Sequence, residues 1–192
     1  PRTSSAASDV YKRQHVISEI LYITANALSS QSIYSLSNFY LNLAKYLNDD
    51  FHSYDTFLEE NFYIIENNKK AKIIYNDLSQ KGKAFAWYSS KQLAKIFLEE
   101  ENKSKALNLV SAAYHSLVKK EVYETFDYAE FLKNNEKFKD SIILYSKIIN
   151  EVKKDHPLYV EATDGRGVAY ERIGEWDKAE KDLLASLEVN PD

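Results

Sequence analysis

The chain has 192 residues, a length that suits one ordinary domain or a short array of repeats. Its apolar content of 44% argues against disorder, and its 4 glycines and 3 prolines are fewer than strands joined by tight turns normally use, so long helices are favoured. The absence of cysteine excludes disulfides, and a net charge of −4 disfavours binding to nucleic acid or to an anionic membrane.

The first fourteen residues differ in character from the rest of the chain. The stretch SSAASDVYKRQ, from Ser4 to Gln14, is small and polar and has no apolar face at helical or strand spacing. It lacks the apolar segment of a targeting peptide, and it resembles the translated end of a transposase-type sequencing-library adapter. We therefore expect residues 1–14 to be a non-native or disordered leader.

A pattern of about 34 residues recurs five times within residues 15–192. The units cover residues 18–51, 52–85, 87–120, 122–155 and 160–192. Each has a large anchor residue at the same place, and these anchors are Leu28, Phe62, Phe97, Leu132 and Tyr170, spaced 34, 35, 35 and 38 residues apart. The last step is longer because of an insertion, HPLY at residues 156–159, where Pro157 predicts a loop since proline disfavours a helix interior.

The last unit resembles a tetratricopeptide (TPR) repeat, a helix–turn–helix of 34 residues. Residues of the types that the family favours stand at five positions of its pattern, and these are Gly167, Tyr170, Ala179, Leu183 and Pro191. Two positions depart from the pattern, because Thr163 replaces a tryptophan and Arg166 replaces a leucine. The resemblance extends over residues 18–192 and implies an all-α fold, a right-handed α-solenoid of about five TPR units of the bacterial multi-repeat type.

Small residues recur where the two helices of each unit face one another, so that their backbones can approach. We expect the packing positions to be Ala25, Ala94, Ala106, Ala129, Gly167, Tyr170, Ala179 and Pro191. The second unit departs from this rule, since Glu59 stands where the other units have alanine or glycine.

The residues that could support catalysis do not converge on a site. The four histidines are far apart in the sequence, and the stretch DGRG at residues 164–167 lacks the spacing of a phosphate-binding loop. The acidic run at residues 99–101 falls at a predicted helix end, where a solvated charge cluster is ordinary. We therefore expect no enzymatic activity, no metal site and no cofactor.

In TPR proteins the partner binds along the first helix of each unit, which lines a concave groove. The resemblance places Tyr63, Tyr88, Lys91, Lys95, Tyr123, Phe126, Lys133 and Arg172 in that groove. Lysines mixed with aromatic residues favour a peptide with acidic and apolar side chains. The alternative is that these residues are merely solvated helix faces. Lys91 and Lys95 do not reproduce the clamp with which one TPR subfamily holds the carboxylate of a chaperone tail.

The sequence thus predicts a scaffold that binds a protein or peptide partner. The alternatives are the non-catalytic repeat region of a larger transferase or kinase, and a self-assembling structural array. The missing methionine and the absence of a polar capping helix after the last unit predict a fragment, truncated at its C-terminus. No apolar run reaches the ~20 residues of a transmembrane helix. The compartment stays open between cytoplasm and cell envelope.

Overall fold

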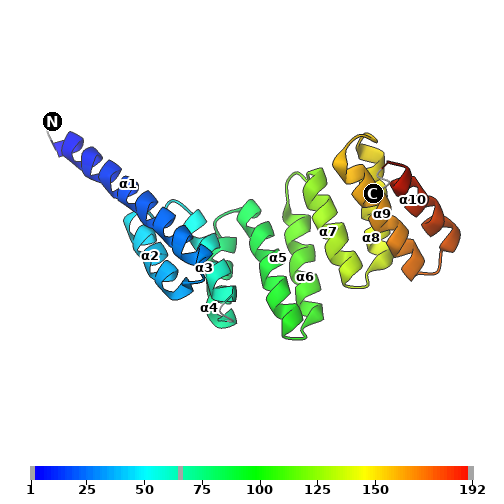
Figure 1. Ribbon diagram of the computed structural model, residues 1–192, viewed down its shortest axis with the longest axis horizontal. Coiled ribbons are helices and arrows are strands. Elements are labelled where there is room, and N and C mark those ends of the chain that lie inside the picture. The colour runs from blue at the N-terminus through cyan, green and yellow to red at the C-terminus, as the bar shows by residue number, and fades with distance from the viewer. Residues whose placement is uncertain (1–2, 65–66, 190–192) are drawn as a thin grey trace. The chain divides into compact units, whose positions relative to one another are not determined.

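The computed structural model describes residues 3–64 and 67–189, and the regular structure within these ranges is entirely helical (Figure 1). The helices are α1 (Thr3–Ser30), α2 (Tyr34–Leu47), α3 (Ser53–Ile64), α4 (Asn68–Ser79), α5 (Lys83–Glu99), α6 (Lys103–Ser116), α7 (Val122–Asn134), α8 (Phe138–Glu151), α9 (Pro157–Arg172) and α10 (Trp176–Val189). Consecutive helices are antiparallel and form about five helix–turn–helix pairs. The expected all-α fold is confirmed.

The predicted anchor residues close the first helix of each pair. The carbonyls of Leu28, Phe62, Phe97, Leu132 and Tyr170 each accept a hydrogen bond from the backbone amide five residues later, at N···O distances of 2.9, 2.8, 2.7, 2.9 and 3.0 Å. In four of these turns the residue before the donor has a positive φ, and these residues are Ser32, Glu101, Glu136 and Gly174. This geometry is a Schellman motif, which ends a helix and reverses the chain within three residues.

The chain forms two compact units, Pro1–Ile96 and Phe97–Asp192, and the boundary falls within α5. In the first unit α2 packs against α1 and α3, and α3 packs against α4. The core of α1 to α3 is made of Ala25, Leu41, Ala44, Tyr54 and Leu58, all nearly inaccessible to solvent. In the second unit α7, α8 and α9 pack around Ala129, Tyr145, Ile148, Leu158 and Ala162, and α10 packs against α9.

The predicted small residues are buried, and two glycines sit against large side chains. Ala25, Ala94, Ala106 and Ala129 are fully buried, Ala179 nearly so, and Tyr170 is half-buried. A Cβ added at Gly167 would stand 2.9 Å from Cγ of Leu183, and one at Gly165 would stand 2.7 Å from Cζ of Tyr145. Pro191 lies outside the described residues.

The leader is helical, and the insertion differs from the expectation drawn from the sequence. Residues 3–14 belong to α1, since this stretch has neither glycine nor proline and a helix propagates at one hydrogen bond per residue. That residues 1–14 are a non-native leader stays a prediction. The loop expected at residues 156–159 is wrong, since α9 begins at Pro157. Proline is well tolerated in the first turn of a helix, where its missing N–H has no intrahelical partner. The imidazole of His156 caps this helix, accepting from the amide of Leu158 at 3.1 Å.

Arg166, which replaces the family's leucine, forms an ion pair inside the second unit. Its guanidinium donates to both carboxylate oxygens of Asp182, at 2.7 and 2.8 Å, and to Oγ of Ser146 at 3.0 Å. The Asp182 side chain is only 8% exposed. The bidentate pair therefore links α9 to α10 and α8 where an apolar contact was expected.

Enlarging a packing alanine should destabilise the fold by overpacking. Ala106→Leu places three extra carbon atoms at a fully buried position of α6 and should cost about 1–3 kcal/mol of unfolding free energy. Ala112→Leu, at an exposed position of the same helix, is the matched control and should be nearly neutral. Urea denaturation followed by circular dichroism measures both. Equal effects of the two substitutions would show that the packing register is wrong.

Removing one partner of the Arg166–Asp182 pair should be worse than removing both. Arg166→Leu leaves the Asp182 carboxylate buried without its counter-ion and should cost about 3 kcal/mol. The double variant Arg166→Leu/Asp182→Leu should recover much of that loss in thermal unfolding. A double variant at least as unstable as the single one would contradict this assignment.

Candidate functional site

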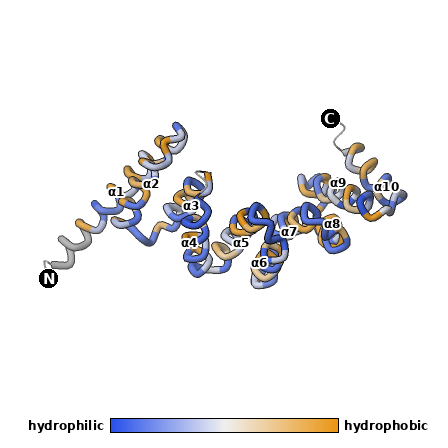
Figure 2. Tube along the Cα trace, turned by 90° about the horizontal axis from the view of Figure 1, so that it is seen from below, coloured by the Kyte–Doolittle hydropathy of each residue, from blue (hydrophilic) through white to orange (hydrophobic). Residues whose placement is uncertain are grey.

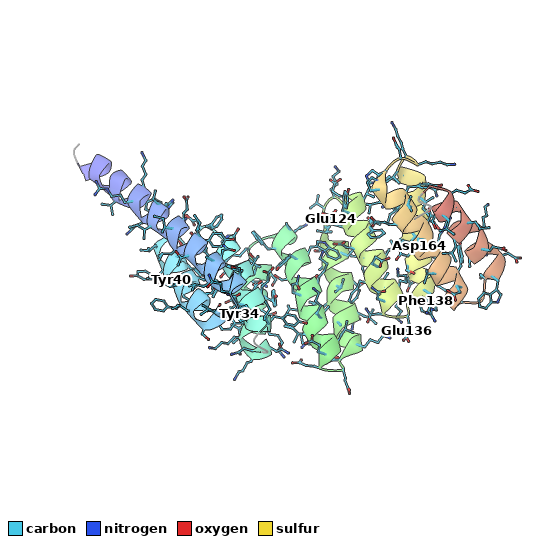
Figure 3. All side chains as sticks on the ribbon, in the orientation of Figure 1. Tyr34, Tyr40, Glu124, Glu136, Phe138 and Asp164 are labelled. Carbon is cyan, nitrogen blue, oxygen red and sulfur yellow. The ribbon has the colours of Figure 1, made fainter. Side chains whose placement is uncertain are left out.

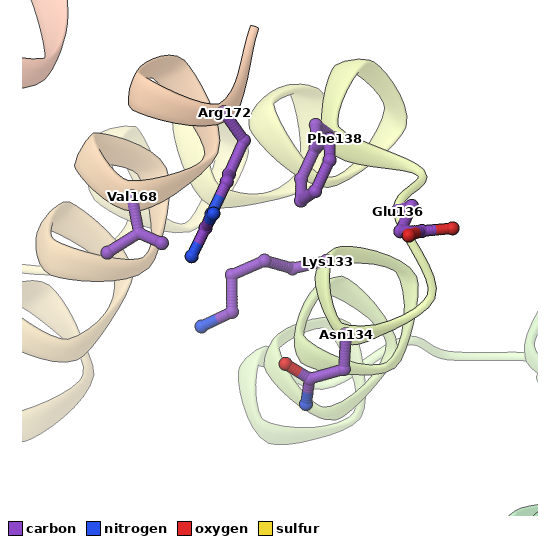
Figure 4. A pocket seen from close by; sticks show the side chains of 6 residues that line it. All are labelled: Lys133, Asn134, Glu136, Phe138, Val168 and Arg172. Carbon is purple, nitrogen blue, oxygen red and sulfur yellow. The ribbon is translucent and has the colours of Figure 1, made fainter.

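Two of the predicted groove residues, Lys133 and Arg172, line one pocket of the second unit. The pocket has a volume of about 490 Å³. The end of α7, the following turn, the start of α8 and the second half of α9 form its wall, through Lys133, Asn134, Glu136, Phe138, Val168 and Arg172 (Figure 4). The Schellman turn around Glu136 is what brings the start of α8 next to the end of α7. We call this site the α7–α9 pocket.

The charges directed into the α7–α9 pocket are positive. Figure 4 shows the charged ends of Lys133 and Arg172 entering the same space beside Val168, whereas the carboxylate of Glu136 points away. That carboxylate pairs instead with Nζ of Lys103 at 2.5 Å, and this hydrogen bond lowers the pKa of Glu136. Within the described part of the chain, Arg172 has no ion-pair partner. Two cations that share a pocket attract an anion.

The ammonium group of Lys133 is held in place by neighbours in the same unit. It pairs with Oε1 of Glu130, one turn earlier on α7, at 2.6 Å. The same carboxylate oxygen accepts a hydrogen bond from the hydroxyl of Tyr145 on α8. Burial, together with this bond, raises the pKa of Tyr145 well above its usual range. Lys133 is thus partly neutralised and fixed in position, and Arg172 carries the uncompensated charge.

Apolar side chains lie beside these cations. Phe138 and Val168 are half-buried and form the apolar wall of the pocket. Figure 3 shows Glu136 and Phe138 at one end of the α7–α8 pair and Glu124 near the other end. An occupant of the pocket would therefore meet two cationic and two apolar side chains.

The two aromatic groove residues of α7 have different surroundings. Tyr123 is 61% exposed, and its ring centroid lies 6.0 Å from that of His156. Phe126 packs against the core, with its ring edge-on to Tyr145 at 6.1 Å between centroids. Phe126 therefore contributes to packing as well as to the surface, which the sequence register did not indicate.

The remaining predicted groove residues belong to the first unit. Tyr63 on α3 and Tyr88 on α5 are half-buried, and the hydroxyl of Tyr88 donates to Oε1 of Glu60 at 3.4 Å. Nζ of Lys91 lies 5.2 Å from the centre of the Trp87 ring one turn earlier, and Lys95 is exposed. These side chains give α3 and α5 a surface of mixed aromatic and cationic character.

Glu59 is a buried carboxyl group, and the sequence did not indicate its burial. It is fully buried on α3, and neither carboxylate oxygen has a hydrogen-bond partner among the described residues. Burial raises the pKa of Glu59 to about 9, and the nearby carboxylates of Asp55 and Glu60 add to the shift. Because the carboxyl group is inaccessible to solvent, it cannot contact a ligand, but its ionisation affects the stability of the fold.

Within the described residues no three His, Cys, Asp or Glu side chains cluster in a way that could hold a metal ion. No helix in these ranges is long and apolar enough to cross a membrane.

Solved structures, TPR proteins among them, share this fold, although their sequences differ greatly. YrrB, described as a TPR protein with an unusual peptide-binding site, matches with a TM-score of 0.60 and 18% identity, over 90% of this chain and 86% of its own. MamA matches with a TM-score of 0.65 and 14% identity, over 91% and 92%. BtubC from P. vanneervenii matches with a TM-score of 0.69 and 10% identity, over 99% and 90%. No protein-family model and no curated protein matches the chain.

Glu59 should make the stability of the fold fall as the pH rises. The folded chain keeps this proton up to a pKa of about 9, whereas the unfolded chain loses it near the ordinary value of 4.5. The stabilising contribution is therefore complete below pH 4.5 and is lost progressively towards pH 9, by up to about 1.4 kcal/mol per pH unit.

The substitution Glu59→Gln should remove this pH dependence. The free energy of unfolding of the variant should therefore increase relative to that of the wild type as the pH rises. Urea unfolding at pH 5, 7 and 9 (roughly spanning the titration) measures the difference. Glu180→Gln, at an exposed position of α10, is the control. Parallel pH profiles for wild type and Glu59→Gln would show that Glu59 is ionised in the folded chain.

Proposed function

We propose that the chain is a protein-interaction scaffold that binds a peptide with acidic and apolar side chains at the α7–α9 pocket. The observation that carries this proposal is the convergence of Lys133 and Arg172 on one pocket with an apolar wall. A guanidinium group presents two parallel N–H donors to a carboxylate, so Arg172 is the principal contact. Lys133, already oriented by Glu130, supplies the second charge.

The open shape of the site favours a peptide over an enclosed small molecule. The pocket is formed by residues at helix ends and on exposed helix faces, and the exposed ring of Tyr123 lies farther along α7. An extended segment can place a carboxylate near Arg172 and apolar side chains against Phe138 and Val168. Aromatic rings offer a large contact area at low entropic cost. The TPR fold supports this function, since it generally serves as a non-catalytic binding scaffold, and so does the peptide-binding site named for YrrB.

The predicted residues of the first unit belong to the same proposal. Tyr63, Tyr88, Lys91 and Lys95 offer the same combination of aromatic surface and positive charge on α3 and α5. This surface of the first unit is therefore a separate candidate contact for a partner of the same chemistry. Its contribution can be separated from that of the pocket by substituting the exposed Lys95.

The proposal predicts that Arg172 determines the affinity for an acidic peptide. The probe is a fluorescein-labelled peptide in which glutamate and leucine alternate, and its binding is followed by fluorescence anisotropy. Arg172→Ala should weaken binding at least tenfold, because a charge-assisted hydrogen bond is worth about 1.5–3 kcal/mol. Lys147→Ala, at an exposed position of α8 outside the pocket, should leave affinity unchanged.

A lysine–leucine peptide of the same length tests whether the recognition depends on charge. It should bind more weakly than the acidic peptide, and raised salt should weaken the binding of the acidic peptide. Equal binding of both peptides, or an unchanged affinity in Arg172→Ala, would contradict the proposed function.

A further inference from the structure

The outer face of α2 is apolar and exposed, although α2 also packs into the core through its other side. Leu36, Phe39, Leu43 and Tyr46 are 43, 60, 39 and 86% exposed. The opposite side of the same helix carries the buried Leu41 and Ala44. Figure 2 shows hydrophobic stretches, in orange, along α2. The helix is thus apolar on two opposite faces, and the outer one is exposed, with the ring of Phe39 edge-on to the adjacent Tyr40 at 5.6 Å between centroids.

The spacing of the four outer residues is that of a coiled-coil seam. Residues 36, 39, 43 and 46 follow steps of three, four and three, which correspond to the a and d positions of two successive heptads. Such a stripe stays on one side of a helix and packs into the side chains of a facing helix. A solvent-exposed helix of a monomer would normally have polar residues at these places.

The outer face also lacks charge. Lys45 is the one charged residue of α2, and its ammonium group pairs with the buried Asp55 of α3 at 2.5 Å. A helix that binds an anionic membrane surface needs basic residues flanking its apolar face, and α2 has none on this side. The centres of protein–protein interfaces are depleted of charge and rich in aromatic residues, as this face is.

The stripe is symmetric about its own centre. Leu36 and Tyr46 lie five residues before and after Leu41, and Phe39 and Leu43 lie two residues before and after it. In an antiparallel pair with a twofold axis level with Leu41, Leu36 therefore faces Tyr46 of the other copy, and Phe39 faces Leu43. Every contact is between apolar groups, and no like charges meet.

We propose that the outer face of α2 binds the same face of a second copy of this chain, as an antiparallel helix pair about a twofold axis. A 14-residue helix is about 21 Å long, so the contact is smaller than a standard interface and the dimer is weak and concentration-dependent. None of the four α2 residues of this contact lines the α7–α9 pocket, which belongs to the other compact unit.

The test uses two single variants that weaken the homodimer and complement one another. Leu36→Glu and Tyr46→Lys should each reduce self-association at least tenfold in sedimentation equilibrium, because each places a charge against an apolar residue. When the two variants are mixed, the introduced glutamate of one chain faces the introduced lysine of the other, and the second Leu36–Tyr46 contact stays intact. The mixture should therefore form a heterodimer more strongly than either variant forms a homodimer.

Controls separate this contact from general stickiness and from unfolding. Ile143→Glu, at a 66% exposed apolar position of α8, should leave self-association unchanged. Circular dichroism should show the same helix content in all variants. A wild type that stays monomeric at millimolar concentration, a dimer indifferent to Leu36→Glu, or a mixture without preferred heterodimers would each overturn the proposal. The first of these results would assign the face to a different partner.

Discussion

An equivalent backbone hydrogen bond ends the first helix in each of the five described helix pairs. It joins the carbonyl of each anchor residue, from Leu28 to Tyr170, to the amide five residues later. The bond satisfies a carbonyl that would otherwise lack a partner at the helix end, and it reverses the chain within three residues. The next helix therefore returns along the first, and the small residues at the contact determine how closely the two can pack.

The positive φ in this turn causes more backbone strain at some residues than at others. A positive φ is easy for Gly174 but strained for Ser32, Glu101 and Glu136, since a side chain there crowds the backbone. The chain accepts that strain because the packing of the helices on both sides outweighs it. The turn at Glu136 also shapes the α7–α9 pocket. The turn at Glu136 brings Phe138 beside Lys133, and the ion pair with Lys103 turns the Glu136 carboxylate away from the α7–α9 pocket.

The sequence predicted the helical pairs because the anchors recur at steps that only a repeat explains. It also selected Lys133 and Arg172, since repeat register alone decides which residues of a first helix share a face. It could not assign Phe126, because the ring contacts Tyr145 of another helix and such contacts depend on packing that register does not specify. The same limit applies to Arg166, because the register predicts a lost apolar contact there and does not predict the ion pair with Asp182.

Two other features show why periodicity is an incomplete guide. Glu59 was recognised as an exception, but only the structure shows that both of its oxygens are buried without partners. In α2 the apolar residues form two stripes, and a sequence pattern cannot say which stripe is the core and which is exposed. Both features arise where local rules are broken, and in proteins such places often have a role beyond folding.

The central claim is that the α7–α9 pocket binds an acidic peptide, and an NMR titration tests it most directly. The ¹⁵N-labelled chain is titrated with the unlabelled glutamate–leucine peptide, and amide shifts are followed residue by residue. The account predicts that the largest changes occur at Lys133, Asn134, Val168 and Arg172, and saturate together. Changes confined to other helices, or no saturable change at these four residues, would contradict it.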